Sequence, residues 1–250
     1  MTGRPVLVTG ASRGIGRAIA VALAARGDRV AVHYGSDHAA GEQTAELLDG
    51  NGHVVLGADL ASAEAARDLV DAAADALGGL NVLVNNAALF PEHRVLSASW
   101  EQWQAAWEQT LAVNLVAPAA TSWAAARHLA AAGGGAIVNV SSRGAFRGEP
   151  HAPAYGASKA GLNALGQSLA VALAPVGISV HTVAPGFVET AMARGLLDGP
   201  EGDAIRAQSP FGRVATAEEV ARVVAFLAEP GSAFTSGGIV DVNGASYLRT

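Results

Sequence analysis

Tyr155 and Lys159 form the residue pair in this sequence with the clearest chemical potential. They stand four positions apart in the run Tyr-Gly-Ala-Ser-Lys at 155–159. The surrounding pattern predicts a helix over 154–174, so both side chains lie on one helix face. A phenol has a pKa of about 10, and a nearby ammonium lowers that pKa by favouring the phenolate. The pair therefore predicts a tyrosine that exchanges a proton with a substrate, with its pKa lowered by Lys159.

Two further polar positions can join this pair. Ser141 and Ser142 end a predicted strand, where a hydroxyl can donate to a carbonyl oxygen and to the alkoxide that develops on reduction. The residues alone do not choose between the two serines, and both can simply cap the strand. Asn114 is a polar residue in the apolar stretch 111–115, where a buried amide usually satisfies backbone groups.

The run Thr-Gly-Ala-Ser-Arg-Gly-Ile-Gly at 9–16 predicts an anion-binding loop. It follows a predicted strand and opens a predicted helix. Glycines let the turn tighten and bring backbone N–H groups close to a pyrophosphate, and the helix N-terminus favours negative charge. An ordinary glycine-rich turn is the alternative, but the strand-turn-helix context favours dinucleotide binding.

Short apolar runs alternate with helical stretches along the chain. The predicted strands are 5–9, 29–33, 54–58, 81–84, 136–140, 179–183 and 239–242. The predicted helices are 15–26, 39–48, 63–77, 100–132, 154–174 and 217–228. Strands that are apolar without alternation belong to parallel sheets covered on both faces. The fold class predicted is α/β, a single-domain Rossmann-type doubly wound parallel sheet of about seven strands with helices on both faces.

No linker composition divides residues 1–250, and the glycines at 133–135 are interpreted as closing a helix. The least regular segment is 185–213, which is rich in glycine and proline. A long irregular segment inside a compact fold is usually functional, so we expect it to be a substrate lid.

Composition narrows the classes of function. The net charge is −6, only 15% of residues are charged, and there is no cysteine. These values argue against nucleic acid and anionic membranes as partners, and they exclude disulfides and thiolate metal sites. The seven histidines lack metal-ligand spacing, so no metal is predicted. Without a leader or an apolar run of about 18–20 residues, we expect a cytoplasmic protein.

Several aromatic and basic residues admit two interpretations. Trp100, Trp103 and Trp107 recur at helical spacing, which is typical of a core or subunit-contact stripe. Arg143 and Arg147 follow the serines and can meet an anionic substrate, but solvated arginines are the favoured interpretation.

The glycine spacing Gly-x-x-x-Gly-x-Gly, the Tyr-x-x-x-Lys pair and the serine thirteen residues before the tyrosine resemble the short-chain dehydrogenase/reductase family. The resemblance extends over nearly the whole chain, through five ordered motifs, and includes reductases of 3-oxoacyl-[acyl-carrier-protein]. It selects Ser142 over Ser141 and implies that Asn114 holds a water linking the lysine to solvent. It also implies that Lys159 binds the nicotinamide ribose.

The resemblance assigns the remaining cofactor contacts by motif. Asp59 and Leu60 follow the third strand and correspond to the adenine contact, and Asn86 and Ala87 belong to a motif that departs from the family at Ala88, where glycine is usual. The full set expected at the cofactor is Gly10, Ser12, Arg13, Gly14, Ile15, Gly16, Tyr34, Ser36, Asp59, Leu60, Asn86, Ala87, Tyr155, Lys159, Pro185, Gly186, Val188 and Thr190.

NADP(H) is expected in preference to NAD(H), which stays possible. Tyr34 stands where NAD-specific relatives place an aspartate, and Arg13 stands where NADP-using relatives often carry a basic residue. Ser36 replaces the second arginine of many such relatives, and Asp37 must point away for a 2′-phosphate to be accepted.

The resemblance implies hydride transfer from the nicotinamide to a ketone, with Tyr155 giving its proton to the oxygen and Ser142 polarising the carbonyl. The substrate is a small molecule or an acyl thioester. The alternatives are an NAD-dependent dehydrogenase of a secondary alcohol, sugar or steroid, and a non-catalytic cofactor-binding scaffold. Relatives pair the helices at 100–132 and 154–174 across a dimer interface, which implies a homotetramer.

Overall fold

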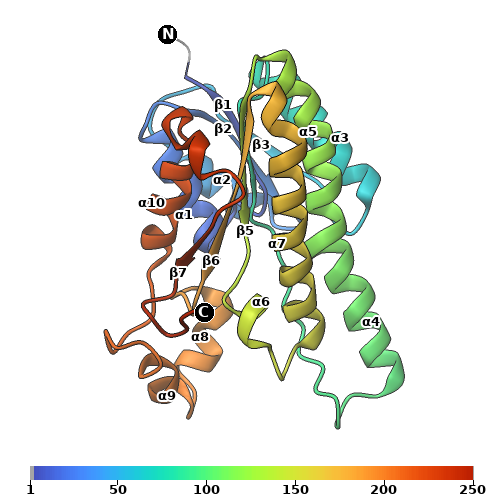
Figure 1. The fold of residues 1–250 in the computed structure, drawn as a ribbon, viewed down its shortest axis with the longest axis vertical. Coiled ribbons are helices and arrows are strands. Elements are labelled where there is room, and N and C mark those ends of the chain that lie inside the picture. The colour runs from blue at the N-terminus through green and yellow to red at the C-terminus, as the bar shows by residue number, and fades with distance from the viewer. Residues whose placement is uncertain (1–2, 250) are drawn as a thin grey trace.

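The computed structural model describes residues 3–249, and strands alternate with helices along this part of the chain. All strand pairs are parallel, and they form a seven-stranded sheet of order β3-β2-β1-β4-β5-β6-β7 (Figure 1). The strands are β1 (Pro5–Val8), β2 (Arg29–Tyr34), β3 (Val54–Gly57), β4 (Val82–Asn85), β5 (Gly135–Val140), β6 (Ile178–Pro185) and β7 (Ile239–Val242). The predicted single α/β domain is confirmed.

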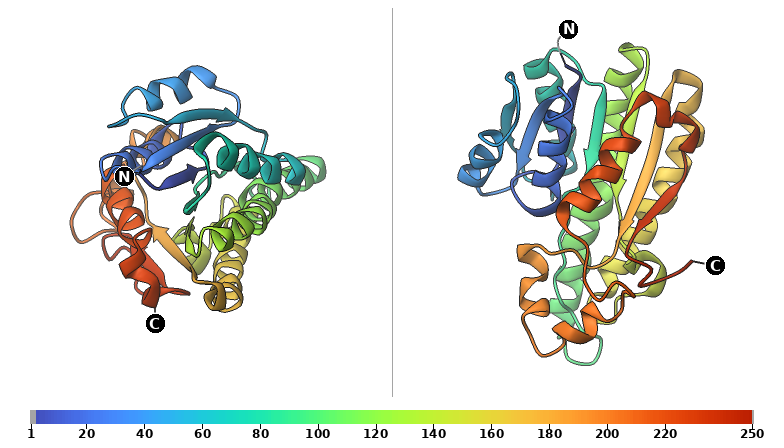
Figure 2. Two further views of the ribbon diagram at one scale, coloured as in Figure 1. Left: turned by 90° about the horizontal axis from the view of Figure 1, so that it is seen from above. Right: turned by 90° about the vertical axis from the view of Figure 1, so that its left-hand side faces the viewer.

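The helices cover both faces of this sheet (Figures 1 and 2). They are α1 (Gly14–Ala24), α2 (His38–Ala45), α3 (Ala63–Leu77), α4 (Trp100–Leu111), α5 (Ala117–Ala131), α6 (Gly144–Arg147), α7 (Pro153–Leu173), α8 (Ala191–Leu197), α9 (Gly202–Arg206) and α10 (Ala217–Leu227). Short 3₁₀ turns occupy Ala174–Val176 and Pro230–Thr235. In the described residues, no helix is both long and apolar enough to cross a membrane.

The buried strands separate two cores. Side chains alternate across a strand, so Val6 and Val8 join the core beneath α1 and α10, whereas Leu7 joins the core beneath α3, α5 and α7. Both cores consist almost entirely of Val, Leu, Ile and Ala. The sheet is therefore buried on both faces, as the uninterrupted apolar runs predict.

The strand order places the functional loops together. The order reverses between β1 and β4, because the chain builds one half of the sheet outward from β1 and then returns to build the other half from β4. In doubly wound sheets, ligands bind beyond the carboxyl ends of the strands at such a switch point. The loops after β1, β4, β5 and β6 meet at this edge.

Two predicted elements differ from the structure. The helix expected over 100–132 is interrupted by a π-helical turn, Ala112–Val116, that contains Asn114. The segment 185–213 is more regular than expected, since it contains α8 and α9. Most of its glycines and prolines lie outside these two helices, and α8 contains alanine, methionine and leucine, which have good helix propensity.

Candidate active site

A cavity of about 770 Å³ opens at the carboxyl edge of the sheet. Of the residues proposed for the site, only Tyr34 and Asn114 are absent from its lining. The predicted residues that line it are Gly10, Ser12, Arg13, Gly14, Ile15, Gly16, Ser36, Asp59, Leu60, Asn86, Ala87, Ser142, Tyr155, Lys159, Pro185, Gly186, Val188 and Thr190. Motifs spread over 180 residues therefore meet in one cavity.

The glycine loop leaves no room for side chains where it turns. Gly10 has a φ of +62° and Gly14 a φ of +54°, in the left-handed region that favours glycine. A Cβ at Gly16 would lie 2.1 Å from the carbonyl oxygen of Gly10. Asn86 fixes the loop from the next strand over, since its Nδ2 donates to the oxygens of Thr9 and Gly10 at 2.9 and 3.1 Å. This close-packed turn at the start of α1 fits the pyrophosphate of a dinucleotide.

His33, on β2, holds the same loop by a hydrogen bond, and the sequence motifs did not predict this role. Its Nδ1 accepts a hydrogen bond from the backbone N–H of Gly10 at 2.9 Å, and its Nε2 lies 3.1 Å from the oxygen of Ala58. Burial lowers the pKa of His33, which is 2% exposed. The sequence feature that could have indicated this role is the position of His33, a polar residue near the end of a buried strand.

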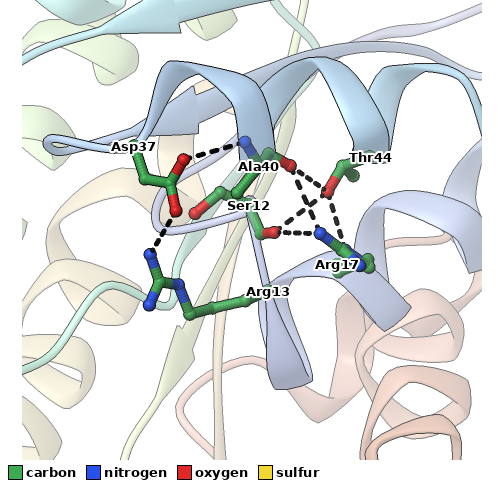
Figure 3. Close-up of polar contacts among 6 residues, drawn as sticks. All are labelled: Ser12, Arg13, Arg17, Asp37, Ala40 and Thr44. Atoms are coloured by element: carbon green, nitrogen blue, oxygen red, sulfur yellow. Dashed lines mark hydrogen bonds and ion pairs between the residues drawn. The ribbon is translucent and has the colours of Figure 1, made fainter. Parts of the chain in front are cut away.

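Arg13 and Asp37 meet at the rim of the cavity (Figure 3). Arg13 Nη2 lies 3.2 Å from Asp37 Oδ2, and both side chains are exposed. The other carboxylate oxygen of Asp37 accepts the backbone N–H of Ala40 and caps α2. Asp37 therefore does not point away, as unhindered binding of a 2′-phosphate would require, because capping α2 turns the carboxylate toward the glycine loop.

Arg17 ties that loop to α2 (Figure 3). Its guanidinium donates to the oxygen of Ser12 at 2.6 Å and to Thr44 Oγ1 at 2.9 Å. Thr44 Oγ1 donates to the same oxygen of Ser12. Arg17 therefore positions the loop, and the rim arginine is Arg13.

Tyr34 does not reach the cavity. Its ring packs against His38 with centroids 5.2 Å apart, and it fills the space beside Gly41 and Gly57, where a Cβ would collide with the ring. The structure thus places Tyr34 between α2 and β3, outside the lining of the cavity in which the cofactor contact was expected. The two glycines give the ring a space that the sequence motif does not reveal.

Tyr155 and Lys159 extend from the first turns of α7 on one face, as their spacing predicts. Lys159 is 2% exposed, its Nζ donates to the oxygen of Val140 at 2.8 Å, and it lies 5.7 Å from the centroid of the Tyr155 ring. Phe90, from the loop after β4, packs edge-on against Tyr155 with centroids 4.8 Å apart. The pair is therefore held between the end of β5 and the loop after β4.

The pKa of Tyr155 is shifted in the direction opposite to the sequence-based expectation. Burial raises it to about 12, a hydrogen bond with Ser142 opposes the rise, and the nearby Glu149 charge adds to it. Burial lowers the pKa of Lys159 to about 8. Without a ligand, desolvation thus outweighs any effect of the ammonium on the phenol.

The two serines have different partners. Ser141 is buried and its Oγ donates to the backbone oxygen of Lys159 at 3.2 Å, which is a structural contact. Ser142 lines the cavity, and its Oγ accepts the backbone N–H of Gly144 at 3.0 Å. Both serines line the cavity, but Ser141 is 4% exposed and Ser142 is more exposed, so Ser142 stays the predicted hydroxyl for a substrate.

Asn114 acts behind the cavity wall. Its Oδ1 accepts the N–H of Leu89, and its Nδ2 donates to the oxygen of Leu89 at 2.9 Å and to Ser158 Oγ at 3.2 Å. Ser158 Oγ in turn donates to the oxygen of Tyr155. The π-helical turn thus connects the loop after β4 to α7, and π-turns of this kind are frequent at functional sites. Both amide donors are occupied, so a water relay would use an oxygen of Asn114.

The other positions with two interpretations also have defined places. Trp103 packs against Trp107 and His93, while Trp100 is 69% exposed. Arg147 is exposed, but Arg143 is only 4% exposed and lines the cavity, so the solvated interpretation is wrong for Arg143. Residues 3–249 contain no cluster of three or more His, Cys, Asp or Glu suited to a metal ion.

Comparison with known proteins identifies the family of the chain. Residues 10–245 match the family model described as enoyl-(acyl carrier protein) reductase. The chain is 35% identical to the 3-oxoacyl-[acyl-carrier-protein] reductase of Vibrio cholerae, covering 99% of each chain. It is 39% identical to the cis-4-hydroxycyclohexanecarboxylate dehydrogenase of Sinomonas cyclohexanicum, covering 96% of this chain and 95% of that protein.

The solved structures agree in fold over the whole length. A short-chain dehydrogenase from Burkholderia cenocepacia, determined in complex with NADP, superposes with a TM-score of 0.88 at 37% identity, covering 98% of both chains. A putative short-chain alcohol dehydrogenase from Sinorhizobium meliloti gives a TM-score of 0.90 at 35% identity, covering 98% of this chain and 97% of that chain. The ordered motifs, the sheet and these relatives together establish that the chain belongs to the short-chain dehydrogenase/reductase family of oxidoreductases, which act on alcohol and ketone groups.

Proposed function

We propose that the protein reduces a ketone to a secondary alcohol with NADPH. The observation that carries this proposal is the placement of Tyr155, Ser142 and Lys159 around one cavity that is continuous with the glycine loop. A proton donor, a hydroxyl for the carbonyl oxygen and a buried ammonium are the groups that carbonyl reduction requires.

Tyr155 is the proton donor in the reductive direction. A phenol with a pKa of about 12 keeps its proton at neutral pH and can give it to the developing alkoxide. Ser142 Oγ donates a second hydrogen bond to the same substrate oxygen, first as the carbonyl oxygen and then as the developing alkoxide. After transfer, Lys159 is the nearby ammonium that stabilises the phenolate, and Asn114 holds the α7 backbone at Tyr155 through Ser158.

The nicotinamide cofactor would supply the hydride. The glycine loop and the N-terminus of α1 would hold its pyrophosphate, Asp59 and Leu60 its adenine, and Asn86 and Ala87 the region between. Pro185, Gly186, Val188 and Thr190 line the same cavity and would contact the nicotinamide. The tight Gly10–Gly16 contact is the observation that fits this group.

The preference for NADPH rests on Arg13, and it is supported by the Burkholderia cenocepacia relative, whose structure was determined in complex with NADP. Tyr34 does not contribute to this preference, because it packs away from the cavity. Asp37 weakens the preference, since its carboxylate is already paired with Arg13 and would repel a 2′-phosphate. Ser36 lines the rim and can donate one hydrogen bond. We therefore propose a preference and not an exclusion of NADH.

The reverse reaction, oxidation of a secondary alcohol, is the second candidate. It is supported by relatives of similar identity that are named dehydrogenases, among them an L-rhamnose 1-dehydrogenase of Azotobacter vinelandii at 37% identity. The same three side chains would serve, with Tyr155 as the base. In that direction the raised pKa of Tyr155 is a barrier that bound cofactor and substrate must lower.

A panel assay tests the proposal. Purified protein is incubated with NADPH or NADH and with 3-oxoacyl thioesters, cyclic ketones, keto acids and aldoses, and with NADP⁺ or NAD⁺ and the corresponding alcohols. Absorbance of the reduced cofactor is followed. We expect turnover of at least one ketone class, with higher kcat/KM for NADPH. Binding of cofactor without turnover of any substrate would favour the non-catalytic scaffold.

A further inference from the structure

Arg143, the residue after Ser142, is a buried charge without an ion-pair partner. It is 4% exposed and lines the same cavity as Tyr155. None of the ion pairs among residues 3–249 includes it. A buried guanidinium is costly unless an opposite charge and hydrogen bonds compensate it. Because this buried guanidinium lies beside the reacting groups, we expect its opposite charge to come from an anionic group of the bound ligand.

The protein holds this side chain in place but leaves most of its donors unused. The backbone N–H of Arg143 donates to the oxygen of Pro185 at 2.8 Å, which ties the end of β5 to the end of β6. Nη1 donates to Ser246 Oγ at 2.6 Å, and Cζ lies 5.3 Å from the centroid of the Phe187 ring. In the described part of the chain, Ser246 is the only hydrogen-bond partner of a guanidinium that carries five N–H donors.

The surrounding charges leave this end of the cavity positive. Burial lowers the pKa of Arg143, repulsion by Arg147 lowers it further, and the attraction of Glu149 opposes these effects more weakly. Burial also raises the pKa of Glu149, whose carboxylate lies over Gly144, where a Cβ would be 2.3 Å from its Oε1. Arg147 is occupied at the rim, where its Nη1 donates to Gln208 Oε1 at 2.9 Å.

We propose that Arg143 binds a carboxylate of the substrate, so that the protein acts on keto acids and the corresponding hydroxy acids. This inference rests on the proposed function and names its substrate class. The planar guanidinium matches a carboxylate with two parallel hydrogen bonds. The Phe187 ring offers an apolar wall for the carbon skeleton between the carboxylate and the carbonyl.

Position favours a small keto acid over a phosphorylated thioester. Arg143 and Ser142 line the same cavity, whose volume is about 770 Å³, so one small molecule can place an anion at Arg143 and a carbonyl at Ser142. The phosphates of a coenzyme or carrier thioester are separated from the carbonyl by a long arm, and they would lie outside this part of the cavity.

The test compares matched substrates in matched variants. The probes are 4-oxopentanoate and 5-oxohexanoate, each paired with its uncharged primary amide. The variants are Arg143→Gln and Arg143→Lys, with Arg147→Gln as a control for an exposed arginine of the same cavity. Ser246→Ala is a second control, because it removes the protein partner of Arg143 and keeps the charge.

We expect the wild type to prefer each acid to its amide in kcat/KM. Arg143→Gln should reduce that preference by about 10- to 100-fold, mainly through KM for the acid, and leave the amide within about threefold. Arg143→Lys should retain part of the preference, since lysine keeps the positive charge but cannot donate two parallel hydrogen bonds to a carboxylate. Arg147→Gln should change the ratio by less than about threefold, and Ser246→Ala should keep it.

Three outcomes would overturn the proposal. Equal losses for acid and amide in Arg143→Gln, with a lowered melting temperature, would make Arg143 a structural residue. A raised KM for NADPH alone would assign it to the cofactor, and a wild type that prefers phosphorylated thioesters would assign it to a phosphate. Calorimetric titration of 4-oxopentanoate into the NADP⁺-loaded wild type and Arg143→Gln separates this inference from the proposed function, because NADP⁺ has no hydride to give a ketone and carboxylate binding is then measured without turnover.

Discussion

At the scale of single residues, Tyr155 holds its proton more tightly than a free phenol does. Its ring is enclosed by Phe90, and the negative charge of Glu149 acts on it, so the ionised form is disfavoured. Lys159 does not reverse this in the ligand-free protein, because its Nζ donates to Val140 and its own pKa falls to about 8. The Tyr155 phenol is therefore protonated and can donate its proton to a carbonyl oxygen.

Replacing Tyr155 by phenylalanine removes only this proton donor. We expect kcat for ketone reduction to fall by about 10²- to 10⁴-fold, the range typical of general acid catalysis, while NADPH binding measured by fluorescence changes little. Tyr247→Phe is the matched control, because its hydroxyl makes only a long contact with the oxygen of Phe146. Near-normal kcat in Tyr155→Phe would reject the assignment.

Cofactor preference depends on the exposed pair Arg13 and Asp37. Asp37→Asn keeps an oxygen to cap α2 but removes the charge that occupies Arg13. We expect the ratio of kcat/KM for NADPH to that for NADH to rise by about tenfold in this variant. In Arg13→Ala it should fall by about 10- to 100-fold, the scale of one charge-assisted contact. A wild type that favours NADH, or a ratio unmoved by both changes, would contradict the interpretation of Arg13.

At the scale of elements, His33 joins β2 to the loop before α1 and to the segment after β3. Its Nδ1 must be unprotonated to accept the N–H of Gly10, and its Nε2 contacts the oxygen of Ala58. One neutral imidazole therefore connects the anion-binding loop to two strands. A proton on Nδ1 would break the contact with Gly10.

The lowered pKa of His33 predicts a loss of stability in mild acid. The unfolded chain takes up a proton as the pH falls through the ordinary value of 6.5, whereas folded His33 does so only at lower pH. The contribution is therefore complete above pH 6.5 and is lost as the pH falls toward the folded pKa. Between pH 7.5 and 5.5, we expect urea unfolding to give a loss about 1 kcal/mol larger in the wild type than in His33→Asn. His38→Asn, at an exposed position, should keep the wild-type slope; equal slopes in all three proteins would refute this role of His33.

The segment 189–214 is a long loop with two helices, and backbone hydrogen bonds join its two ends. Glu189 N donates to the oxygen of Ala215, and Ala215 N donates to the oxygen of Phe187, at 2.9 and 3.0 Å. Between these ties lie α8 and α9, and Leu196 and Ile205 face the cavity lining. We propose that this segment, which overlaps the 185–213 lid expected from the sequence, closes over the substrate as a unit.

Hydrogen exchange tests that closure. Amides of α8 and α9 should exchange about tenfold or more slowly in the complex with cofactor and substrate analogue than in the ligand-free protein, while amides of α3, remote from the cavity, should not change. Equal protection of α8 and α9 in both states would count against a lid.

At the scale of the whole molecule, large apolar side chains are exposed on two separate sides. Trp123 and Val171, 54% and 80% exposed, lie on α5 and α7, which cover one face of the sheet (Figure 1). Phe226 and Phe234, on α10 and the turn after it, belong to the opposite face. If each of these two sides contacts the same side of a second copy, the two contacts together generate dihedral symmetry, which is what the expected homotetramer requires.

Light scattering at micromolar concentration should therefore give four times the mass of one chain. Val171→Asp should disrupt one contact and leave dimers formed by the other, and Phe234→Asp should do the converse. Glu46→Lys, at an exposed position of the chain after α2, should leave the tetramer intact. A monomeric wild type would refute the assembly.

The α/β fold, the order of the motifs and the pairing of Tyr155 with Lys159 could all be predicted from the amino-acid sequence. These features depend on local rules, because buried parallel strands require apolar runs and residues four apart share a helix face. Glycines at fixed spacing likewise mark a turn whose geometry depends on a few neighbouring residues. Such features can be inferred without knowing what packs against them.

Which side chains are buried, and which residues they contact, became known from the packing of distant elements. Tyr34 packs into the space left by Gly41 and Gly57, Asp37 turns to Arg13, and Arg143 is buried against a serine 103 positions later in the chain. The direction of the Tyr155 pKa shift has the same origin. The burial of a side chain and the charges around it depend on residues from several elements that are distant in the sequence. The spacing of residues within one element therefore does not predict them.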